Sequence, residues 1–128
     1  MVRPAESRAM RDERYITRQQ QYTAVYEGGS AWVSNLLVIR SLPNGLSFSR
    51  YGFSISRRVG KAVVRNRMRR RIREILRQVP VKPGWDIVVI ARVAAAAANY
   101  AGLRQTVLEL LARARLLEEN EDFCLGTN

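Results

Sequence analysis

The sequence contains no histidine and a single cysteine, Cys124, among its 128 residues. Without histidine, the chain lacks the commonest general base and the commonest transition-metal ligand. One cysteine can form neither a disulfide within the chain nor a cysteine-based zinc site, so a reducing compartment is compatible with the sequence. These absences exclude histidine-based catalysis, a disulfide within the chain and a zinc site built from cysteines.

Long apolar runs are also missing. No stretch approaches the length that spans a bilayer, and the first ten residues, MVRPAESRAM, lack the apolar core of a signal peptide. A chain of 128 residues with 47% apolar residues is long enough to bury a real core as one domain. We therefore expect a soluble, cytoplasmic, single-domain protein.

Acidic residues are scarce where basic residues are most frequent. The segment from 50 to 78, RYGFSISRRVGKAVVRNRMRRRIREILRQ, holds 11 basic residues and one acid, so it carries +10 of the chain's +11. A potential this concentrated attracts polyanions, and counterion release from a phosphate backbone would supply affinity. Arginine outnumbers lysine by 20 to 2, which favours bidentate phosphate contacts and stacking on bases. The charge pattern predicts a nucleic-acid partner.

The clearest periodic pattern in this segment predicts a helix from about Ala62 to Val79. Its apolar residues recur at helical spacing and form one stripe: Val64, Met68, Ile72, Ile75, Leu76 and Val79. The opposite side is expected to carry Asn66, Arg69, Arg70, Arg73 and Arg77, with Arg65, Arg67 and Arg71 on the flanks. A solvated face usually mixes charges of both signs, whereas like charges at this density repel one another unless an anion neutralises them. The pattern favours nucleic-acid binding.

Two strand-like runs, which allow up to three strands, precede this helix. A β-type run from Trp32 to Leu42 and a returning strand from Leu46 to Ser56 flank Pro43-Asn44-Gly45, whose turn chemistry predicts a hairpin. In the returning strand, one face is small, polar and positive at one end: Arg50, Gly52, Ser54 and Ser56. This face is either ordinary solvent-facing sheet or a surface on which an extended strand of nucleic acid can lie.

Helices are expected at both ends of the folded region. A capping box at Thr17 and Gln20 predicts a short helix to about Glu27, ended by Gly28-Gly29. After the basic helix, Trp85 to Ala91 is a predicted buried strand, and Asn99 is a candidate cap for a last helix to about Leu117. The order is helix, up to three strands, basic helix, strand, helix, which predicts an α+β fold, an α/β sandwich of one sheet with helices packed on it.

The domain boundaries follow from charge and pattern. Residues 1–14 are expected to form a basic leader, which is either a solvated tail or an arm that touches nucleic acid. Residues 15–117 are expected to form the folded nucleic-acid-binding domain, and residues 118–128 an acidic tail.

Tyr22 and Tyr26 lie four residues apart and share one face of the first helix. Such a pair either packs in the core or forms a stacking platform for unpaired bases.

Residues 54 to 70, SISRRVGKAVVRNRMRR, resemble the signature of the bacterial ribonuclease P protein subunit, including its Arg-Asn-Arg core at residues 65–67. Tyr22 and Tyr26 stand where that family carries paired aromatics, and residues 86–92 look like its last strand. The resemblance covers about residues 14 to 117. It implies a ribonucleoprotein endonuclease that removes the 5′ leader from precursor tRNA, with catalytic Mg²⁺ held mainly by the RNA subunit and substrate. It also implies a left-handed β-α-β crossover through the basic helix.

The resemblance, together with the charge pattern, assigns one group of residues to the RNA subunit: Lys61, Arg65, Asn66, Arg67, Arg69, Arg70, Arg73 and Arg77. It assigns a second group to the precursor tRNA leader: Tyr22, Tyr26, Arg50, Ser54, Ser56, Arg57 and Arg58. No catalytic or metal-ligating residue is expected on the protein, because the basic region has no carboxylate cluster that could hold two magnesium ions. Asp86 is an isolated acid at a strand start, where a turn or capping role is expected.

Three alternatives remain at this stage. An arginine-rich, ribosomal-protein-like RNA-binding module without a nuclease role would carry the same charge. A helix-turn-helix DNA-binding protein would need two short helices joined by a tight turn, whereas strand-like residues precede the basic helix here. A protein-only nuclease would cleave RNA without an RNA subunit.

Overall fold

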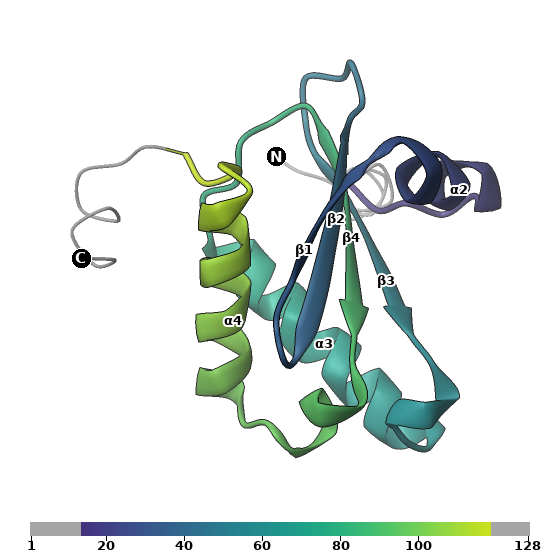
Figure 1. Cartoon of the computed structure of the whole chain (residues 1–128), viewed down its shortest axis with the longest axis vertical. Helices are drawn as coiled ribbons and strands as arrows, with labels where there is room; N and C mark the ends of the chain where they lie inside the picture. The colour runs from purple at the N-terminus through teal and green to yellow at the C-terminus, as the bar shows by residue number, and fades with distance from the viewer. Residues whose placement is uncertain (1–13, 119–128) are drawn as a thin grey trace, which may run out of the picture.

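The secondary-structure elements occur in the predicted order in a computed structural model, which describes residues 14–118 (Figure 1). The three α-helices and four strands are α2 (Gln19–Gly28), β1 (Ser30–Val33), β2 (Leu37–Pro43), β3 (Arg50–Ile55), α3 (Ala62–Gln78), β4 (Trp85–Ala91) and α4 (Tyr100–Arg113). Two short 3₁₀ helices follow β3 and β4, η1 (Arg57–Val59) and η2 (Val93–Ala97). The predicted leader at residues 1–14 and tail at residues 118–128 lie outside the described residues, apart from Arg14 and Glu118.

The sheet has the order β1-β2-β4-β3, so the hairpin predicted between Trp32–Leu42 and Leu46–Ser56 is wrong. β4 lies between β2 and β3, antiparallel to the first and parallel to the second. β4 is apolar and buried along most of its length. Such a strand is stable in the centre of a sheet, where a neighbouring strand hydrogen-bonds to each of its two edges. The actual hairpin joins β1 to β2 through a turn at Ser34, whose hydroxyl accepts hydrogen bonds from the backbone N–H groups of Leu36 and Leu37.

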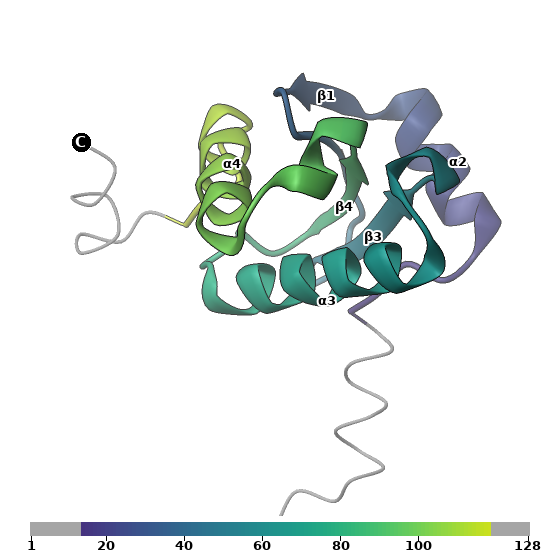
Figure 2. The same cartoon turned by 90° about the horizontal axis from the view of Figure 1, so that it is seen from below.

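The connection from β3 through α3 to β4 is a left-handed crossover. In Figure 1, β3 and β4 both run downward, and β4 lies to the left of β3. α3 passes behind the two strands in this view, and Figure 2, seen from below, also shows α3 on a single side of the sheet. Crossovers between parallel strands are nearly always right-handed. The expected α+β architecture with its left-handed crossover is therefore confirmed.

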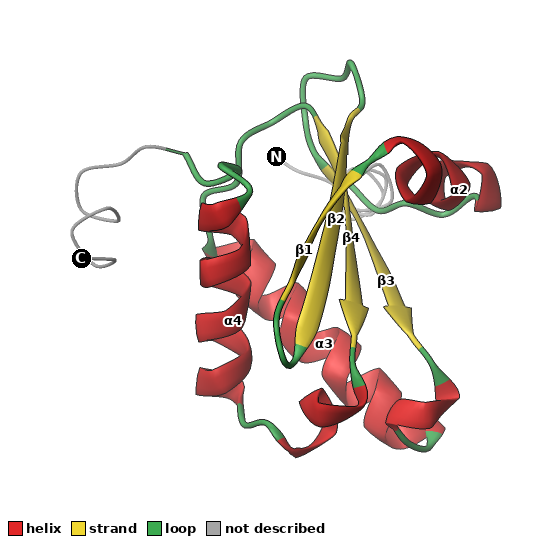
Figure 3. Ribbon diagram, in the orientation of Figure 1, coloured by secondary structure: helices red, strands yellow, loops and turns green. Residues whose placement is uncertain are grey.

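Helices cover the two faces of the sheet unequally (Figures 2 and 3). α3 and α4 pack on one face, where they bury the larger core, which includes Leu37, Ile39, Ile72 and Leu110. α2 alone packs on the other face, where Val25 meets Val88 of β4 in a smaller cluster. One face of the sheet is therefore only partly covered by helix.

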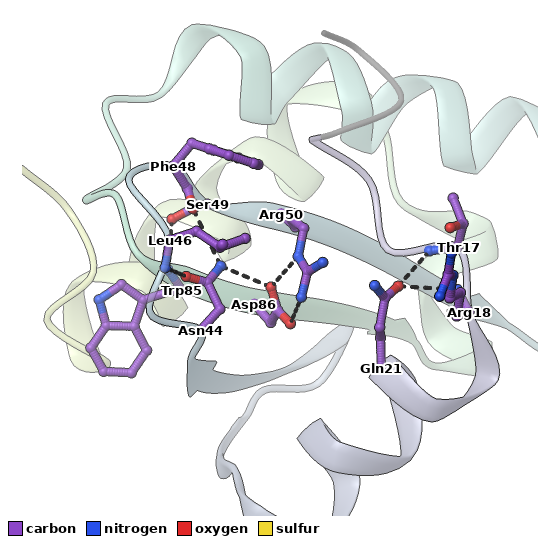
Figure 4. Close-up of polar contacts among 10 residues, drawn as sticks. All are labelled: Thr17, Arg18, Gln21, Asn44, Leu46, Phe48, Ser49, Arg50, Trp85 and Asp86. Carbon is purple, nitrogen blue, oxygen red and sulfur yellow. Dashed lines mark hydrogen bonds and ion pairs between the residues drawn. The ribbon is translucent and has the colours of Figure 1, made fainter. Parts of the chain in front are cut away.

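Both outer helices are present, but their limits differ from the predicted ones. α2 starts after Arg18 rather than Thr17, because the side chain of Gln21, not Gln20, accepts hydrogen bonds from the backbone N–H groups of Thr17 and Arg18 (Figure 4). The side chain of Asn99 caps α4, accepting a 2.8 Å hydrogen bond from the N–H of Gly102. α4 ends earlier than expected, since Arg115 has a φ of 60° in the left-handed region, where a helix cannot continue.

Candidate nucleic-acid interface

α3 is held by one face, as its apolar spacing predicted. Met68, Ile72, Ile75, Leu76 and Val79 are buried in the core between α3 and the sheet, and Val64 is half-buried. Burying such side chains contributes about 1.5–3 kcal/mol each relative to leaving them in water. This face therefore fixes the orientation of the helix and leaves its other sides to polar residues.

Five arginines of α3 fall into two environments. Arg67, Arg70 and Arg77 are exposed, while Arg65 and Arg69 are half-buried and bonded along the helix. Arg69 donates to the side-chain oxygen of Asn66 at 3.0 Å, and Arg65 donates to the carbonyl of Gly60 at 3.1 Å. These bonds fix the two guanidinium groups at the first turns of α3. Lys61, which precedes the helix, is exposed beside them.

Acidic partners hardly offset this charge. Among residues 14–118, the single ion pair on α3 joins Arg77 to Glu74 at 3.4 Å, with both side chains largely in solvent. Such surface pairs contribute about 0–1 kcal/mol. The positive charge of the helix is thus left for an external anion.

Arg73 does not occupy the outward face on which the helical spacing placed it. It is half-buried, with its guanidinium carbon 4.8 Å from the ring centroid of Tyr15 and 5.6 Å from that of Phe53. Residues 14–16 explain the difference, because they pair with the outer edge of β3 at Tyr51 and bring Tyr15 alongside α3. A helical wheel of α3 contains no information about that neighbour.

The sheet face beside α2 is partly open. Residues of β2, β4 and β3 form three rows across this face, given by the strand registers: Leu42-Asp86-Arg50, Arg40-Val88-Gly52 and Val38-Ile90-Ser54. Side chains of α2 cover the first two rows through Val25 and Tyr22, while all three members of the last row are half-buried. The open row holds Ser54, one of the residues predicted to meet the leader.

Tyr22 is fixed against the sheet. Its hydroxyl accepts a 3.3 Å hydrogen bond from the N–H of Phe53 and donates to the carbonyl of Ile16 at 3.4 Å. Its ring lies over Gly52, where an added Cβ would come within 2.8 Å of the Tyr22 Cε1 atom. Glycine is needed here for close approach, and Tyr22 forms a wall of the open face.

Tyr26 lies next to Tyr22 on α2 but is exposed, with 37% of its surface in solvent. The guanidinium of Arg40 lies 5.5 Å from its ring centroid and donates a 2.7 Å hydrogen bond to its backbone carbonyl. The pair presents an aromatic ring and a cation together. The two tyrosines, which the sequence could not distinguish, therefore occupy different environments.

Arg50 is bound within the protein (Figure 4). Its guanidinium holds both carboxylate oxygens of Asp86, at 2.8 and 2.6 Å, and this hydrogen bonding raises the pKa of Arg50. Asn44 donates a further 2.9 Å hydrogen bond to Asp86. Asp86 is therefore not an isolated acid: it joins the β2–β3 loop to the starts of β3 and β4. The charge that Arg50 was expected to offer to a ligand is largely neutralised.

The remaining predicted leader residues lie where β3 and β4 end. Ser56, Arg57 and Arg58 are exposed, and Ser56 and Arg58 line a cavity of about 410 Å³ together with Asn35 and Arg92. α3 begins four residues after Arg58, so this end of β3 joins the open sheet face to the basic helix. The two predicted groups of residues are thus contiguous in space.

Three residues near these sites were not identified from the sequence: Tyr15 beside α3, Arg40 beside Tyr26, and Arg92 in the cavity with Arg58. Arg40 could have been identified, because a charged side chain within the apolar run of β2 must either reach solvent or bind a partner on one face of the sheet. Tyr15 and Arg92 carried no comparable signal, since their positions depend on pairing with distant parts of the chain.

Metal-binding groups are few among the described residues. Residues 14–118 contain no cluster of three or more histidine, cysteine, aspartate or glutamate residues that could hold a metal ion. Both oxygens of Asp86 are engaged by Arg50. Within the same range, no helix is long and apolar enough to cross a membrane.

Comparisons with known proteins agree on one family. A family model described as Ribonuclease P matches residues 10–115. A ribonuclease P protein component from Dehalococcoides mccartyi is 41% identical over 110 residues, covering 86% of this chain and 92% of that protein. The corresponding protein from Roseiflexus castenholzii is also 41% identical, over 102 residues that cover 77% of this chain and 84% of that protein.

Solved structures are similar in fold. The RNase P protein from Thermotoga maritima aligns with a TM-score of 0.70 at 29% identity, covering 77% of this chain and 96% of that chain. A Staphylococcus aureus RNase P protein mutant with defective mRNA degradation activity aligns with a TM-score of 0.83 and covers 91% of this chain and all of that one. Its identity is 24%, so this second likeness concerns the fold alone.

Proposed function

Because this chain belongs to the ribonuclease P protein family and is thus a protein subunit of that tRNA-processing endoribonuclease, we propose that it binds the catalytic RNA subunit through α3. We further propose that it holds the 5′ leader of precursor tRNA on the open sheet face beside α2. The resemblance seen at residues 54–70 is confirmed by the family match, and the ribosomal-protein-like alternative is not favoured.

The observation that carries the proposal is the asymmetry of α3. One side is buried in the core, while the sequence from 65 to 77 supplies seven arginines and one glutamate to the remaining sides. Exposed guanidinium groups at Arg67 and Arg70 can each take a phosphate in bidentate geometry. A folded RNA subunit presents many phosphates to such a helix, and counterion release then contributes much of the affinity.

The leader site rests on shape and chemistry at the open row of the sheet. An extended single strand needs a shallow surface, aromatic rings for its bases and cations for its phosphates. Ser54 leaves room on the surface, Tyr26 offers an exposed ring, and Arg57 and Arg58 lie at one end. Paired bases hide their faces inside a duplex, so this arrangement suits an unpaired leader rather than a helix.

Magnesium is assigned in this proposal to the RNA subunit and the substrate. Mg²⁺ prefers carboxylate and phosphate oxygens with several waters, and the surface near α3 is cationic instead. The residues present therefore do not fit a magnesium site, and the protein's part is to bind and orient RNA. Since bacterial tRNA is transcribed in the cytoplasm, the protein would act there.

The direct experiment is cleavage of a precursor tRNA by purified components. We expect the protein alone to be inactive and addition of the cognate RNA subunit with Mg²⁺ to restore cleavage at the 5′ end. At a low Mg²⁺ concentration and constant ionic strength, the RNA subunit with the protein should cleave faster than the RNA subunit without it. Mg²⁺-dependent cleavage by the RNA-free protein would refute this division of labour and support the protein-only nuclease.

A further inference from the structure

A second cavity, of about 330 Å³, lies at the outer edge of β3, on the side of the sheet that α3 covers and not on the open side beside α2. We propose that it is a nucleotide-binding pocket, which takes one unpaired nucleobase together with its phosphate, either within an RNA or as a free mononucleotide. The RNA-borne form rests on the proposed function, because an RNA bound along α3 would supply the base.

The pocket has an aromatic and guanidinium lining suited to a planar ring. The rings of Tyr15 and Phe53 meet at 6.2 Å and 45°, and the guanidinium of Arg73 lies over both. Bases stack on aromatic side chains and on arginine in sites that bind single-stranded nucleic acid. The same three groups line this cavity, so a base entering it would meet two aromatic rings and a guanidinium group.

Arg73 also has an unused donor. Its Nε atom is buried and has no hydrogen-bond partner within residues 14–118. Buried donors are almost always paired in native proteins, so an unpaired one points to a missing acceptor. A carbonyl oxygen or ring nitrogen at the edge of a base is an acceptor of suitable shape.

The rest of the lining completes the recognition of a nucleotide. The side chain of Tyr51 faces the cavity, and burial raises its pKa to about 12, so its hydroxyl stays protonated at neutral pH. Arg14, Arg77 and Glu118 line the cavity and are exposed; the two guanidinium groups outnumber the carboxylate and can neutralise a phosphate. A ring site on the inside with cations at the mouth matches a base inside and a phosphate outside.

Size and position agree with this occupant. Cavities that bury small ligands measure about 300–1,000 Å³, so this one suits a single nucleotide. Arg73 and Arg77 belong both to the pocket and to the basic helix, so a strand on α3 passes the opening. The site is separate from the open row beside α2, which lies across the sheet.

The test is a titration of the isotopically labelled protein with adenosine 5′-monophosphate and, separately, ribose 5-phosphate, followed by backbone amide shifts. We expect the nucleotide to bind about tenfold more tightly than the sugar phosphate, because only the nucleotide can stack. Shifts should centre on Tyr51 and Phe53. Equal affinity for the two compounds would overturn the proposal, since charge alone would then explain binding.

Two variants and a matched control test the assignment of residues. Arg73→Lys keeps the charge but removes the planar group and Nε, and should weaken nucleotide binding about fivefold or more. Tyr51→Phe removes one hydroxyl and should weaken it by a smaller factor. Arg104→Lys, the same change on α4 and away from the cavity, should have no effect. Nucleotide binding by a folded Arg73→Lys protein at wild-type strength would overturn the proposal.

Competition with the cognate RNA subunit separates the two sources of the nucleotide. Where the base comes from RNA, saturating adenosine 5′-monophosphate and Arg73→Lys should each lower affinity for the RNA subunit, while Arg104→Lys does not. Where the ligand is a free nucleotide, binding of adenosine 5′-monophosphate leaves RNA affinity unchanged. Failure of the wild-type protein to bind the RNA subunit would instead refute the proposed function and leave the pocket standing.

Discussion

Alanine substitutions at Tyr22 and Tyr26 should have opposite consequences for stability and for leader binding. Tyr22 packs over Gly52 and makes two hydrogen bonds, at 3.3 and 3.4 Å, whereas Tyr26 is exposed and contacts Arg40. Removing a large buried aromatic costs about 3–5 kcal/mol. Because Tyr22 is half-buried, we expect Tyr22→Ala to lower the unfolding free energy by about 2–4 kcal/mol.

Tyr26→Ala should hardly change stability, since its exposed cation–π contact contributes about 0.5–1 kcal/mol. If its ring stacks on a leader base, the variant should lose about 1–3 kcal/mol of leader binding, a factor of about 5 to 150. The loss should vanish for a tRNA without a leader, because no base is then left to stack on this ring. Tyr26→Phe keeps the ring and serves as the matched control.

The assay combines thermal unfolding of the protein with affinities of the reconstituted enzyme for tRNA with and without a leader. For a domain of this size, each kcal/mol shifts Tm by about 4–8 °C, so Tyr22→Ala should melt at least 8 °C lower. An unchanged melting temperature for Tyr22→Ala would refute the packing argument. A leader-dependent affinity that Tyr26→Ala leaves intact would refute the stacking argument.

Three further predictions concern the sheet. Asp86→Ala leaves Arg50 without its partner, and the two side chains are only 6% (Asp86) and 20% (Arg50) exposed. The variant should therefore lower the unfolding free energy, measured by urea titration, by about 3 kcal/mol. A loss well below about 1 kcal/mol would contradict a stabilising role for this ion pair. The pKa of Tyr51 is raised from 10.0 to about 12 by burial, so its contribution to stability is complete below pH 10 and is lost as the pH rises toward 12. Tyr51→Phe should therefore lose less stability than wild type over that interval, and equal losses would refute the assignment. Gly52→Ala must displace the ring of Tyr22, so it should weaken leader-dependent binding but not affinity for the RNA subunit; unchanged leader binding would show that the ring position is irrelevant.

Local patterns predicted the helices well. The apolar spacing of α3 and the cap at Asn99 depend on neighbours three or four residues away, and both are confirmed. The small, polar face of β3 that carries Ser54 also follows from strand alternation. These features are visible in sequence because their causes lie within one element.

Features that depend on distant pairing were predicted less well. The turn chemistry of Asn44 and Gly45 is real, because Gly45 has a φ of 73° and the Asn44 side chain accepts from the N–H of Leu46. The turn nevertheless does not pair β2 with β3, because β4 lies between them. β4 follows the turn by about 40 residues, and its apolar, buried sequence takes the central position in the sheet. The partners of Arg50 and Arg73 come from equally remote segments, so their charges could not be assigned from spacing alone.

The central claim, that the arginine face of α3 binds the RNA subunit, is tested most directly by the salt dependence of that binding. Arg67 and Arg70 are exposed and lie outside the core, so alanine at either position should leave the fold intact. Each lost phosphate contact should reduce the slope of log affinity against log salt by about 0.7 to 0.9, and the double variant should lose about twice that. Arg104→Ala, on α4, is the control and should leave the slope unchanged. Slopes equal to wild type in the double variant would mean that this face is merely solvated, and would contradict the account.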